Sequence, residues 1–200
     1  MDKTKNIQPK QQSDMTIPIE NQGLSDDISI VESKRVYSGD VSVRLDKLIY
    51  NQKIINEEIV EHSASVGIIP LTDTNEIFLV LQYRHAIGKT ILEIPAGKIE
   101  RGESPEQAAV REMTEEIGHS GNVLPFIQLY LAPGYDTELM YVFIARDLKI
   151  EKAIADDDER IIVKKLKIAD AVKKALNGEI VDSKTLASIL CYWERYSSKK

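Results

Sequence analysis

The sequence predicts an α/β sandwich with a small antiparallel β-ribbon at its amino end. Short apolar runs separated by polar turns indicate strands, and they recur between residues 28 and 145. Segments 104–117, 168–177 and 184–196 show helical spacing with end signals. With 200 residues, of which 42% are hydrophobic, the chain is long enough to bury a substantial core.

The amino-terminal part of the chain divides into a tail and a ribbon. Residues 1–25 are rich in Lys, Gln, Asp, Ser and Asn, and this composition predicts a flexible tail because it buries too little apolar surface to order itself. Residues 26–60 contain short strand-like runs with breaks near 38–40 and 51–52, which predict an antiparallel ribbon. Residues 61–198 are predicted to form the main domain.

The main domain begins with strands. Two strongly apolar strands, 66–70 and 77–82, are joined by a polar turn and belong in the core. A third apolar run covers 90–95 and leads into a glycine-containing loop. Two more strands are predicted at 123–131 and 139–145.

Two helices follow the strands. The helix at 168–177 is ended by Gly178, which suits the end of a helix. The helix at 184–196 is capped by Asp182 or Ser183, since either side chain accepts a hydrogen bond from a free N–H of the first turn. Helices flanking the sheet complete the predicted sandwich.

The helix at 104–117 is marked at both ends. Ser104 is a natural N-cap, Pro105 occupies the first helical position, and Gln107 completes the pattern of a capping box. Gly118 suits the left-handed residue that ends a helix.

This helix carries three carboxylates on one face. Glu112, Glu115 and Glu116 are spaced i, i+3 and i+4. Like charges at this spacing destabilise an isolated helix, so a hard divalent cation that neutralises them would relieve the repulsion. The pattern therefore indicates a site for magnesium or manganese. The alternative is a solvated helix face with ordinary salt bridges.

A specific motif surrounds these carboxylates. Residues 97–118 read GKIERGESPEQAAVREMTEEIG, which resembles the Nudix hydrolase signature of Gly, five residues, Glu, seven residues and Arg-Glu-apolar-x-Glu-Glu-x-Gly. The required positions are Gly97, Glu103, Arg111, Glu112, Met113, Glu115, Glu116 and Gly118. His119 stands where the family usually has an apolar residue. The resemblance implies a Nudix-type α/β/α sandwich and hydrolysis of a pyrophosphate bond.

The resemblance also implies roles for the motif residues. Glu112 and Glu116 look like the main ligands of Mg²⁺ or Mn²⁺, and Glu115 is a further ligand or the base that activates water. The backbone carbonyl of Ala96 is expected to complete the metal site.

A further pair is implied within the motif. Arg111 and Glu103 resemble the residues that hold the loop and the helix together in similar proteins. The resemblance places both among the expected catalytic residues.

Beyond the signature, the chain is similar to ADP-ribose pyrophosphatases over roughly residues 28–196. The runs that carry this similarity are 58–62, 82–84, 92–100, 131–138 and 156–159. The implied reaction is Mg-dependent hydrolysis of ADP-ribose to AMP and ribose 5-phosphate. The alternatives are another nucleoside diphosphate derivative, such as a nucleotide sugar, NADH or a dinucleoside polyphosphate, and a sensor that binds ADP-ribose without cleaving it.

Four residues outside the signature are candidate substrate contacts. Pro133 lies fifteen residues after Gly118, near the position of a proline that shapes the ribose site in similar enzymes, although an ordinary Pro-Gly turn explains it equally well. Glu138 follows in the same loop and favours the functional interpretation. Arg84 ends a strand and is expected to bind the diphosphate, with a surface ion pair as the alternative. Glu93 points toward solvent or the metal cleft, and the resemblance favours the cleft.

An acidic run near residue 158 supplies candidates for the general base. In similar enzymes a glutamate from this loop orients or deprotonates the attacking water, and Glu159 is the first choice, with Asp157 the second. The alternative is a solvated acidic turn.

Charge and composition predict the partners. The net charge of −6 argues against nucleic acid, because backbone affinity needs clustered Lys and Arg. No apolar segment is long enough to span a bilayer, so a soluble cytoplasmic protein without a membrane partner is expected. In similar enzymes the N-terminal ribbon pairs across a two-fold axis, so a homodimer is expected, with a monomer whose sheet edge is simply extended as the alternative.

Overall fold

The computed structural model describes residues 27–151 and 161–197 of the chain. The predicted tail at 1–25 lies outside this range, and so do the two candidate bases Asp157 and Glu159.

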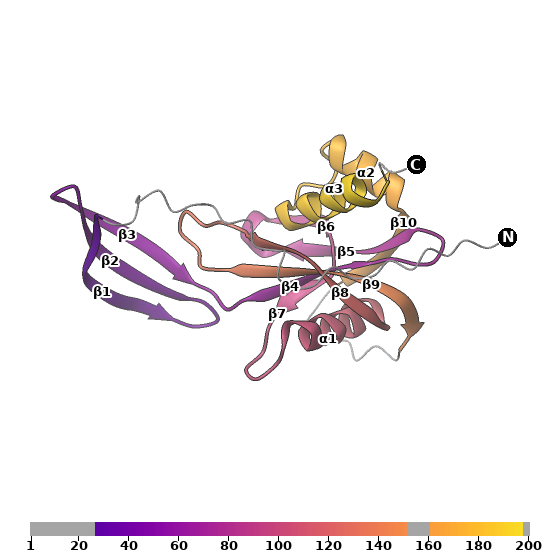
Figure 1. The fold of residues 1–200 in the computed structure, drawn as a ribbon, viewed down its shortest axis with the longest axis horizontal. Coiled ribbons are helices and arrows are strands. Elements are labelled where there is room, and N and C mark those ends of the chain that lie inside the picture. The colour runs from indigo at the N-terminus through magenta and orange to yellow at the C-terminus, as the bar shows by residue number, and fades with distance from the viewer. Residues whose placement is uncertain (1–26, 152–160, 198–200) are drawn as a thin grey trace.

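The N-terminal ribbon is an antiparallel sheet of order β1-β2-β3 that projects from one end of the described molecule (Figure 1). Its strands are β1 (Ile28–Ser38), β2 (Ser42–Tyr50) and β3 (Lys53–Glu61). At the β2–β3 turn Asn51 and Gln52 have φ values of 49° and 60°, the geometry that matches the twist of a tight hairpin. The predicted ribbon is confirmed, and the short runs predicted before residue 39 join into one strand with two register shifts.

The described main body contains two sheets. One has the order β7-β4-β9-β8 and the other has the order β10-β5-β6. The pairing of β4 with β9 is parallel, whereas the remaining pairs are antiparallel. The strands are β4 (Ser65–Pro70), β5 (Glu76–Arg84), β6 (Lys89–Glu93), β7 (Ala96–Lys98), β8 (His119–Tyr130), β9 (Leu139–Ile150) and β10 (Ile161–Lys167).

The structure differs from the predicted strands in two places. The apolar run at 90–95 gives strand β6, which already ends at Glu93, and the start of the predicted glycine loop forms strand β7 from Ala96 in the other sheet. Pro95 lies at this crossing, where its missing N–H costs no ladder hydrogen bond. Strand β10 was not predicted, because its lysines obscure the apolar alternation and its pairing with β5 is long-range.

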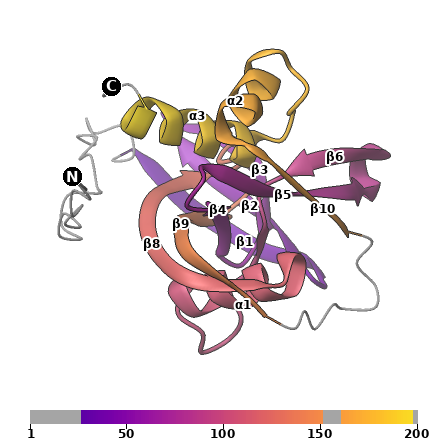
Figure 2. The ribbon, with the colours of Figure 1, turned by 90° about the vertical axis from the view of Figure 1, so that its right-hand side faces the viewer.

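Helices cover both sides of the sheets. Helix α1 (Pro105–Ile117) lies on one side, and α2 (Ile168–Leu176) and α3 (Ser183–Ser197) lie on the other (Figures 1 and 2). Strand β4 and the residue after it supply both cores, because Val66 and Ile68 pack with α1 residues while Ile69 and Leu71 pack with α2 and α3 residues. The predicted α/β/α sandwich is therefore confirmed. None of the helices described in the structure has the length and apolar character needed to cross a membrane.

The helix ends follow the predicted signals. Ser104 Oγ accepts a hydrogen bond from the Gln107 N–H at 3.2 Å, and the Ser104 N–H donates to Gln107 Oε1 at 2.8 Å, which forms the capping box. Gly118 ends α1 with φ of 65°. Of the two candidate caps for α3, Asp182 accepts from the Thr185 N–H at 3.0 Å. The helix ends could be predicted from the sequence because each capping interaction joins residues no more than about four positions apart.

Candidate active site

The first feature of the site is a close approach of backbone and carboxylate at the start of the motif. A Cβ added at Gly97 would lie 1.9 Å from Glu112 Oε1 and 2.0 Å from its carboxyl carbon. Only glycine therefore allows the Glu112 carboxylate to lie against strand β7. The first glycine of the motif is explained by this contact.

A second carboxylate binds the same strand. Glu116 is buried on α1, and its Oε2 accepts a hydrogen bond from the Ala96 N–H at 3.0 Å. Glu112 and Glu116 are thus both held against residues 96–97 from one face of the helix. The predicted contribution of the Ala96 carbonyl to a metal site stays a prediction.

Arg111 organises the remaining acids of the motif. Its guanidinium binds Glu103 with two hydrogen bonds, at 2.9 and 3.0 Å, and its Nη1 donates to Glu112 at 2.7 Å and to Glu115 at 3.0 Å. A further bond from Nη2 reaches the Lys98 carbonyl at 2.9 Å and ties the loop to the helix. The hydrogen bonds from Arg111 hold the pKa of Glu103 below its usual range.

A buried ion cluster lies behind the crossing between β6 and β7. Glu93 is only 1% exposed, and Arg84 binds it through Nε and Nη2, both at 2.7 Å. Lys184 Nζ donates to the same carboxylate and also to Asp182 Oδ1 at 3.0 Å. Burial raises the pKa of Glu93, but the bonds from Arg84 and Lys184 outweigh burial and lower that pKa.

This cluster refines two predictions. The burial of Glu93 excludes the alternative in which it points to solvent. Arg84 is in an ion pair, but with a buried acid rather than a surface acid, and its side chain is 41% exposed. Its contact with a diphosphate stays a prediction.

Sequence reasoning missed Lys184. A signal was present, because a lysine in the first turn of a helix is disfavoured by the helix dipole unless an acid pairs with it. Its partner Glu93 is 91 residues away in the chain, so no local pattern could identify it.

Comparison with known proteins now identifies the family. A family model described as "NUDIX domain" matches residues 61–187, which is more than half of the chain. This chain belongs to the NUDIX family. Nudix hydrolases generally need divalent metal ions.

Curated relatives match the Nudix chain over most of their length. An ADP-ribose pyrophosphatase of Bacillus subtilis (strain 168) is 37% identical over 165 residues, covering 80% of this chain and 89% of that protein. A methanol dehydrogenase activator of Bacillus methanolicus is 32% identical over 164 residues, covering 80% and 89%. An ADP-ribose pyrophosphatase of Mycobacterium tuberculosis (strain ATCC 25618 / H37Rv) is 32% identical over 170 residues, covering 82% of each.

A solved structure has the same fold. The crystal structure of an ADP compounds hydrolase superposes with a TM-score of 0.77 at 21% identity, covering 86% of this chain and 96% of that chain. This likeness supports the Nudix fold.

The residues of the Nudix helix fit a hard divalent cation. Glu112, Glu115 and Glu116 offer carboxylate oxygens, the donors that Mg²⁺ and Mn²⁺ prefer, and the glycine at position 97 leaves room for a carboxylate beside the backbone. Within residues 27–151 and 161–197 no three His, Cys, Asp or Glu side chains converge as a metal-binding group. A cation at this face would compete with Arg111 for Glu112, since Arg111 holds that carboxylate.

The loop between β8 and β9 is a Pro-Gly turn that also fastens the ribbon to the Nudix domain. The Tyr135 N–H donates to the Ala132 carbonyl at 3.1 Å, which closes the turn around exposed Pro133. The Val60 N–H donates to the Tyr135 carbonyl at 2.7 Å, and the Thr137 N–H donates to the Val60 carbonyl at 3.0 Å. The structure confirms the Pro-Gly turn, whereas the role of Pro133 in substrate binding stays a prediction.

Glu138 ties the same loop to the start of β4. Its Oε1 accepts a hydrogen bond from Ser65 Oγ at 2.6 Å, and its Oε2 lies 3.9 Å from His62 Nδ1. The structure therefore gives Glu138 a bridging position between the loop and the core sheet, and its substrate role stays a prediction.

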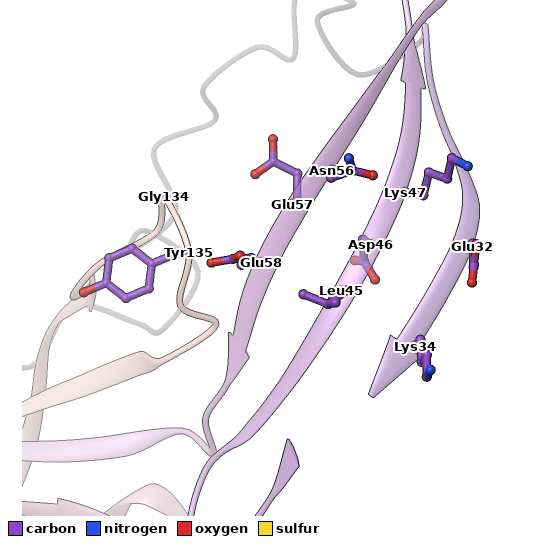
Figure 3. A pocket seen from close by; sticks show the side chains of 10 residues that line it. All are labelled: Glu32, Lys34, Leu45, Asp46, Lys47, Asn56, Glu57, Glu58, Gly134 and Tyr135. Atoms are coloured by element: carbon purple, nitrogen blue, oxygen red, sulfur yellow. The ribbon is translucent and has the colours of Figure 1, made fainter. Parts of the chain in front are cut away.

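A cleft separates this loop from the ribbon. It has a volume of about 710 Å³, and Tyr135 lies on one side while residues of β2 and β3 lie on the other (Figure 3). Its lining includes charged residues of both signs, namely Glu32, Lys34, Asp46, Lys47, Glu57 and Glu58. The cleft is thus built by the ribbon and the Pro133 loop rather than by the carboxylates of the Nudix helix.

Proposed function

We propose that this protein hydrolyses the pyrophosphate bond of ADP-ribose, with Mg²⁺, to give AMP and ribose 5-phosphate. The observation that carries the proposal is a full set of signature acids, held against β7, in a chain that is 37% identical to an ADP-ribose pyrophosphatase. Retention of every signature acid argues against the alternative of a sensor without hydrolytic activity.

The proposed chemistry needs a site that draws charge from a diphosphate. Glu112 and Glu116, with the Ala96 carbonyl, would hold the cation. When bound, Mg²⁺ supplies charge neutralisation for the diphosphate oxygens and acidifies a water molecule. Arg111 and Glu103 position the carboxylates by fixing the loop on the helix.

The chain's own residues complete the reaction. A carboxylate, Glu115 or one of the loop acids Glu159 and Asp157, takes a proton from water while the water oxygen bonds to one phosphorus. The bond between that phosphorus and the bridging oxygen breaks, and the second phosphate leaves with its charge stabilised by Arg84. Water and ADP-ribose thus yield AMP and ribose 5-phosphate. We assign Glu93, Pro133 and Glu138 to the substrate-binding site.

The ribbon supports a homodimer as part of this proposal. Strand β1 is exposed along its whole length, and it presents Ile30, Val31, Val36 and Tyr37 at 50–64% exposure. An apolar sheet edge that no described segment of the chain covers favours association, and a second copy of the chain is the simplest partner. Sedimentation should give twice the chain mass, and a mass of one chain would contradict the dimer. We retain a cytoplasmic location as a prediction.

The test is Mg-dependent release of the nucleoside monophosphate from a substrate panel, which is GMP for GDP-mannose and AMP for the adenosine-containing substrates. ADP-ribose, ADP-mannose, GDP-mannose, NADH and diadenosine polyphosphates are compared, with Glu116→Gln as the inactive variant and Glu106→Gln on the same helix as the matched control. Preference for ADP-ribose that is lost only in Glu116→Gln supports the proposal. If another substrate is preferred, the proposed pyrophosphate hydrolysis stands but the assignment of ADP-ribose as substrate is wrong. Binding of ADP-ribose without cleavage would favour a sensor.

A further inference from the structure

Lys184 is a buried lysine whose position calls for a reason. It is 7% exposed in the first turn of α3, where the helix dipole disfavours a cation. Its ammonium donates to Glu93 and to Asp182, so the charge is fully paired within the protein. Burying such a charge is costly unless its partners compensate, and therefore the pairing itself is the feature to explain.

Glu93 stands between two cations. Its Oε1 accepts from Arg84 Nε, while its Oε2 accepts from both Arg84 Nη2 and Lys184 Nζ. Lys184 approaches from the buried side, whereas Arg84 is partly exposed. Among residues 27–151 and 161–197, Glu93 is the acceptor of the Arg84 side-chain hydrogen bonds, so further N–H groups of this partly exposed guanidinium are free to bind an anion.

Lys184 and Arg84 share the Glu93 carboxylate. Arg84 and Glu93 alone form a neutral pair, whereas Lys184 adds one positive charge beside the carboxylate. With Lys184 neutralising Glu93 from within, the guanidinium keeps more of its attraction for an external anion in this partly desolvated position. Asp182 offsets the charge of Lys184, so the four charges sum to zero, and Asp182 binds Lys184 and the N-terminal turn of α3 rather than Arg84.

The same segment joins this cluster to the carboxylate helix. The Ile94 N–H donates to Thr185 Oγ1 of α3 at 2.8 Å, and two residues later the Ala96 N–H donates to Glu116 at 3.0 Å. Residues 93–96 are therefore fastened to α3 at one end and to α1 at the other. A change at Lys184 reaches the site through this segment and through Glu93.

We propose that Lys184 is a positioning residue for the diphosphate: it holds the buried Glu93 carboxylate, which fixes the guanidinium of Arg84 and leaves that guanidinium its positive charge for substrate. The inference rests on the proposed function, because it takes the diphosphate of ADP-ribose as the anion.

The test separates binding from turnover. Lys184→Met should raise KM for ADP-ribose roughly tenfold, the scale of one charge-assisted hydrogen bond, while kcat changes less than about threefold. Binding of the non-hydrolysable α,β-methylene analogue, measured by calorimetry, should weaken by a similar factor. Lys173→Met, which removes an exposed lysine of α2, is the matched control and should leave both values unchanged.

A double-mutant cycle shows whether Lys184 acts through Arg84. In an Arg84→Ala background, Lys184→Met should change KM less than about twofold, because the guanidinium it positions is gone. Lys184→Gln keeps an N–H donor without the charge, and it tests the same cycle if Lys184→Met folds poorly. Circular dichroism confirms folding of each variant.

Each outcome decides one question. An unchanged KM in both Lys184 variants, or an equal increase with and without Arg84, would overturn the positioning role and leave Lys184 a structural residue. Wild-type protein that releases no AMP from ADP-ribose would instead overturn the proposed function.

Discussion

The two ionic clusters of this Nudix domain differ in composition. Around Arg111, one cation holds three carboxylates, Glu103, Glu112 and Glu115, all within eight residues of it in the chain. Around Glu93, the two cations Arg84 and Lys184 share one buried carboxylate, Lys184 also binds Asp182, and Lys184 lies 91 residues from Glu93 in the chain. The first cluster has an excess of negative charge and suits a cation, whereas the charges of the second balance and Arg84 is its most exposed member.

The two clusters also differ in what they contribute to the fold. The Arg111 cluster is partly exposed, so solvent screens its ion pairs and they add little to stability. The Glu93 carboxylate is buried, so loss of either partner leaves a charge in a dry environment. Changes in the first cluster should therefore appear mainly in activity, and changes in the second should appear in stability as well.

Glu116→Gln should give the largest effect. The amide still accepts the Ala96 N–H but loses the charge that a metal needs, so kcat should fall about 1,000-fold or more while the melting temperature changes little. Steady-state kinetics and a thermal melt measure the two quantities. Near-normal turnover would show that the helix face bearing Glu112 and Glu116 is not the metal site.

Glu93→Ala should be the most damaging change for stability. It leaves the Lys184 ammonium buried without its main partner, which should lower the free energy of unfolding by about 3–5 kcal/mol. Urea denaturation measures this loss. Glu115→Ala is the control in the other cluster, and its cost should be below about 1 kcal/mol. Equal losses in the two variants would remove the distinction between the clusters.

Acid should weaken both clusters. The pKa of Glu93 and that of Glu103 are lowered in the folded protein, so each contributes stability that is present above the unfolded pKa and is lost as pH falls through the folded pKa. The free energy of unfolding should therefore decline below about pH 4.3, the usual carboxyl value. Urea titrations of the wild type and of Glu93→Gln across this pH range measure how much of the decline in the free energy of unfolding is due to Glu93. An identical decline in both proteins would mean that Glu93 contributes none of it.

Ser104→Ala should have the smallest effect. It removes the capping box that starts the Nudix helix, at a cost of about 1 kcal/mol. Denaturant unfolding measures the change, and Ser104→Asp, which preserves a capping oxygen, should recover most of it. Loss of activity well beyond the loss of stability would show that the cap also sets the position of the carboxylates.

Local patterns made the Nudix helix predictable. The capping box, the terminal glycine and the spacing of Glu112 and Glu116 all act within one or two turns, so each is written in neighbouring residues. The apolar strand at 66–70 was predictable for a related reason, since a strand buried on both faces reads as an unbroken apolar run.

Features that depend on contacts between residues distant in the sequence could not be predicted. The split between β6 and β7 depends on which sheet each segment joins, and strand β10 depends on its pairing with β5. The candidate bases Asp157 and Glu159 lie outside the described residues, so their place relative to the Nudix helix stays a prediction.

The sequence by itself determined the family motif, the helix that bears its acids and the positions of most strands along the chain. These features follow from contacts between near neighbours and from apolar periodicity. Only the tertiary structure decided that Gly97 admits the Glu112 carboxylate, that Glu93 is buried between Arg84 and Lys184, and that the Pro133 loop is fastened to the ribbon. Burial and the pairing of charges are properties of segments brought together by folding.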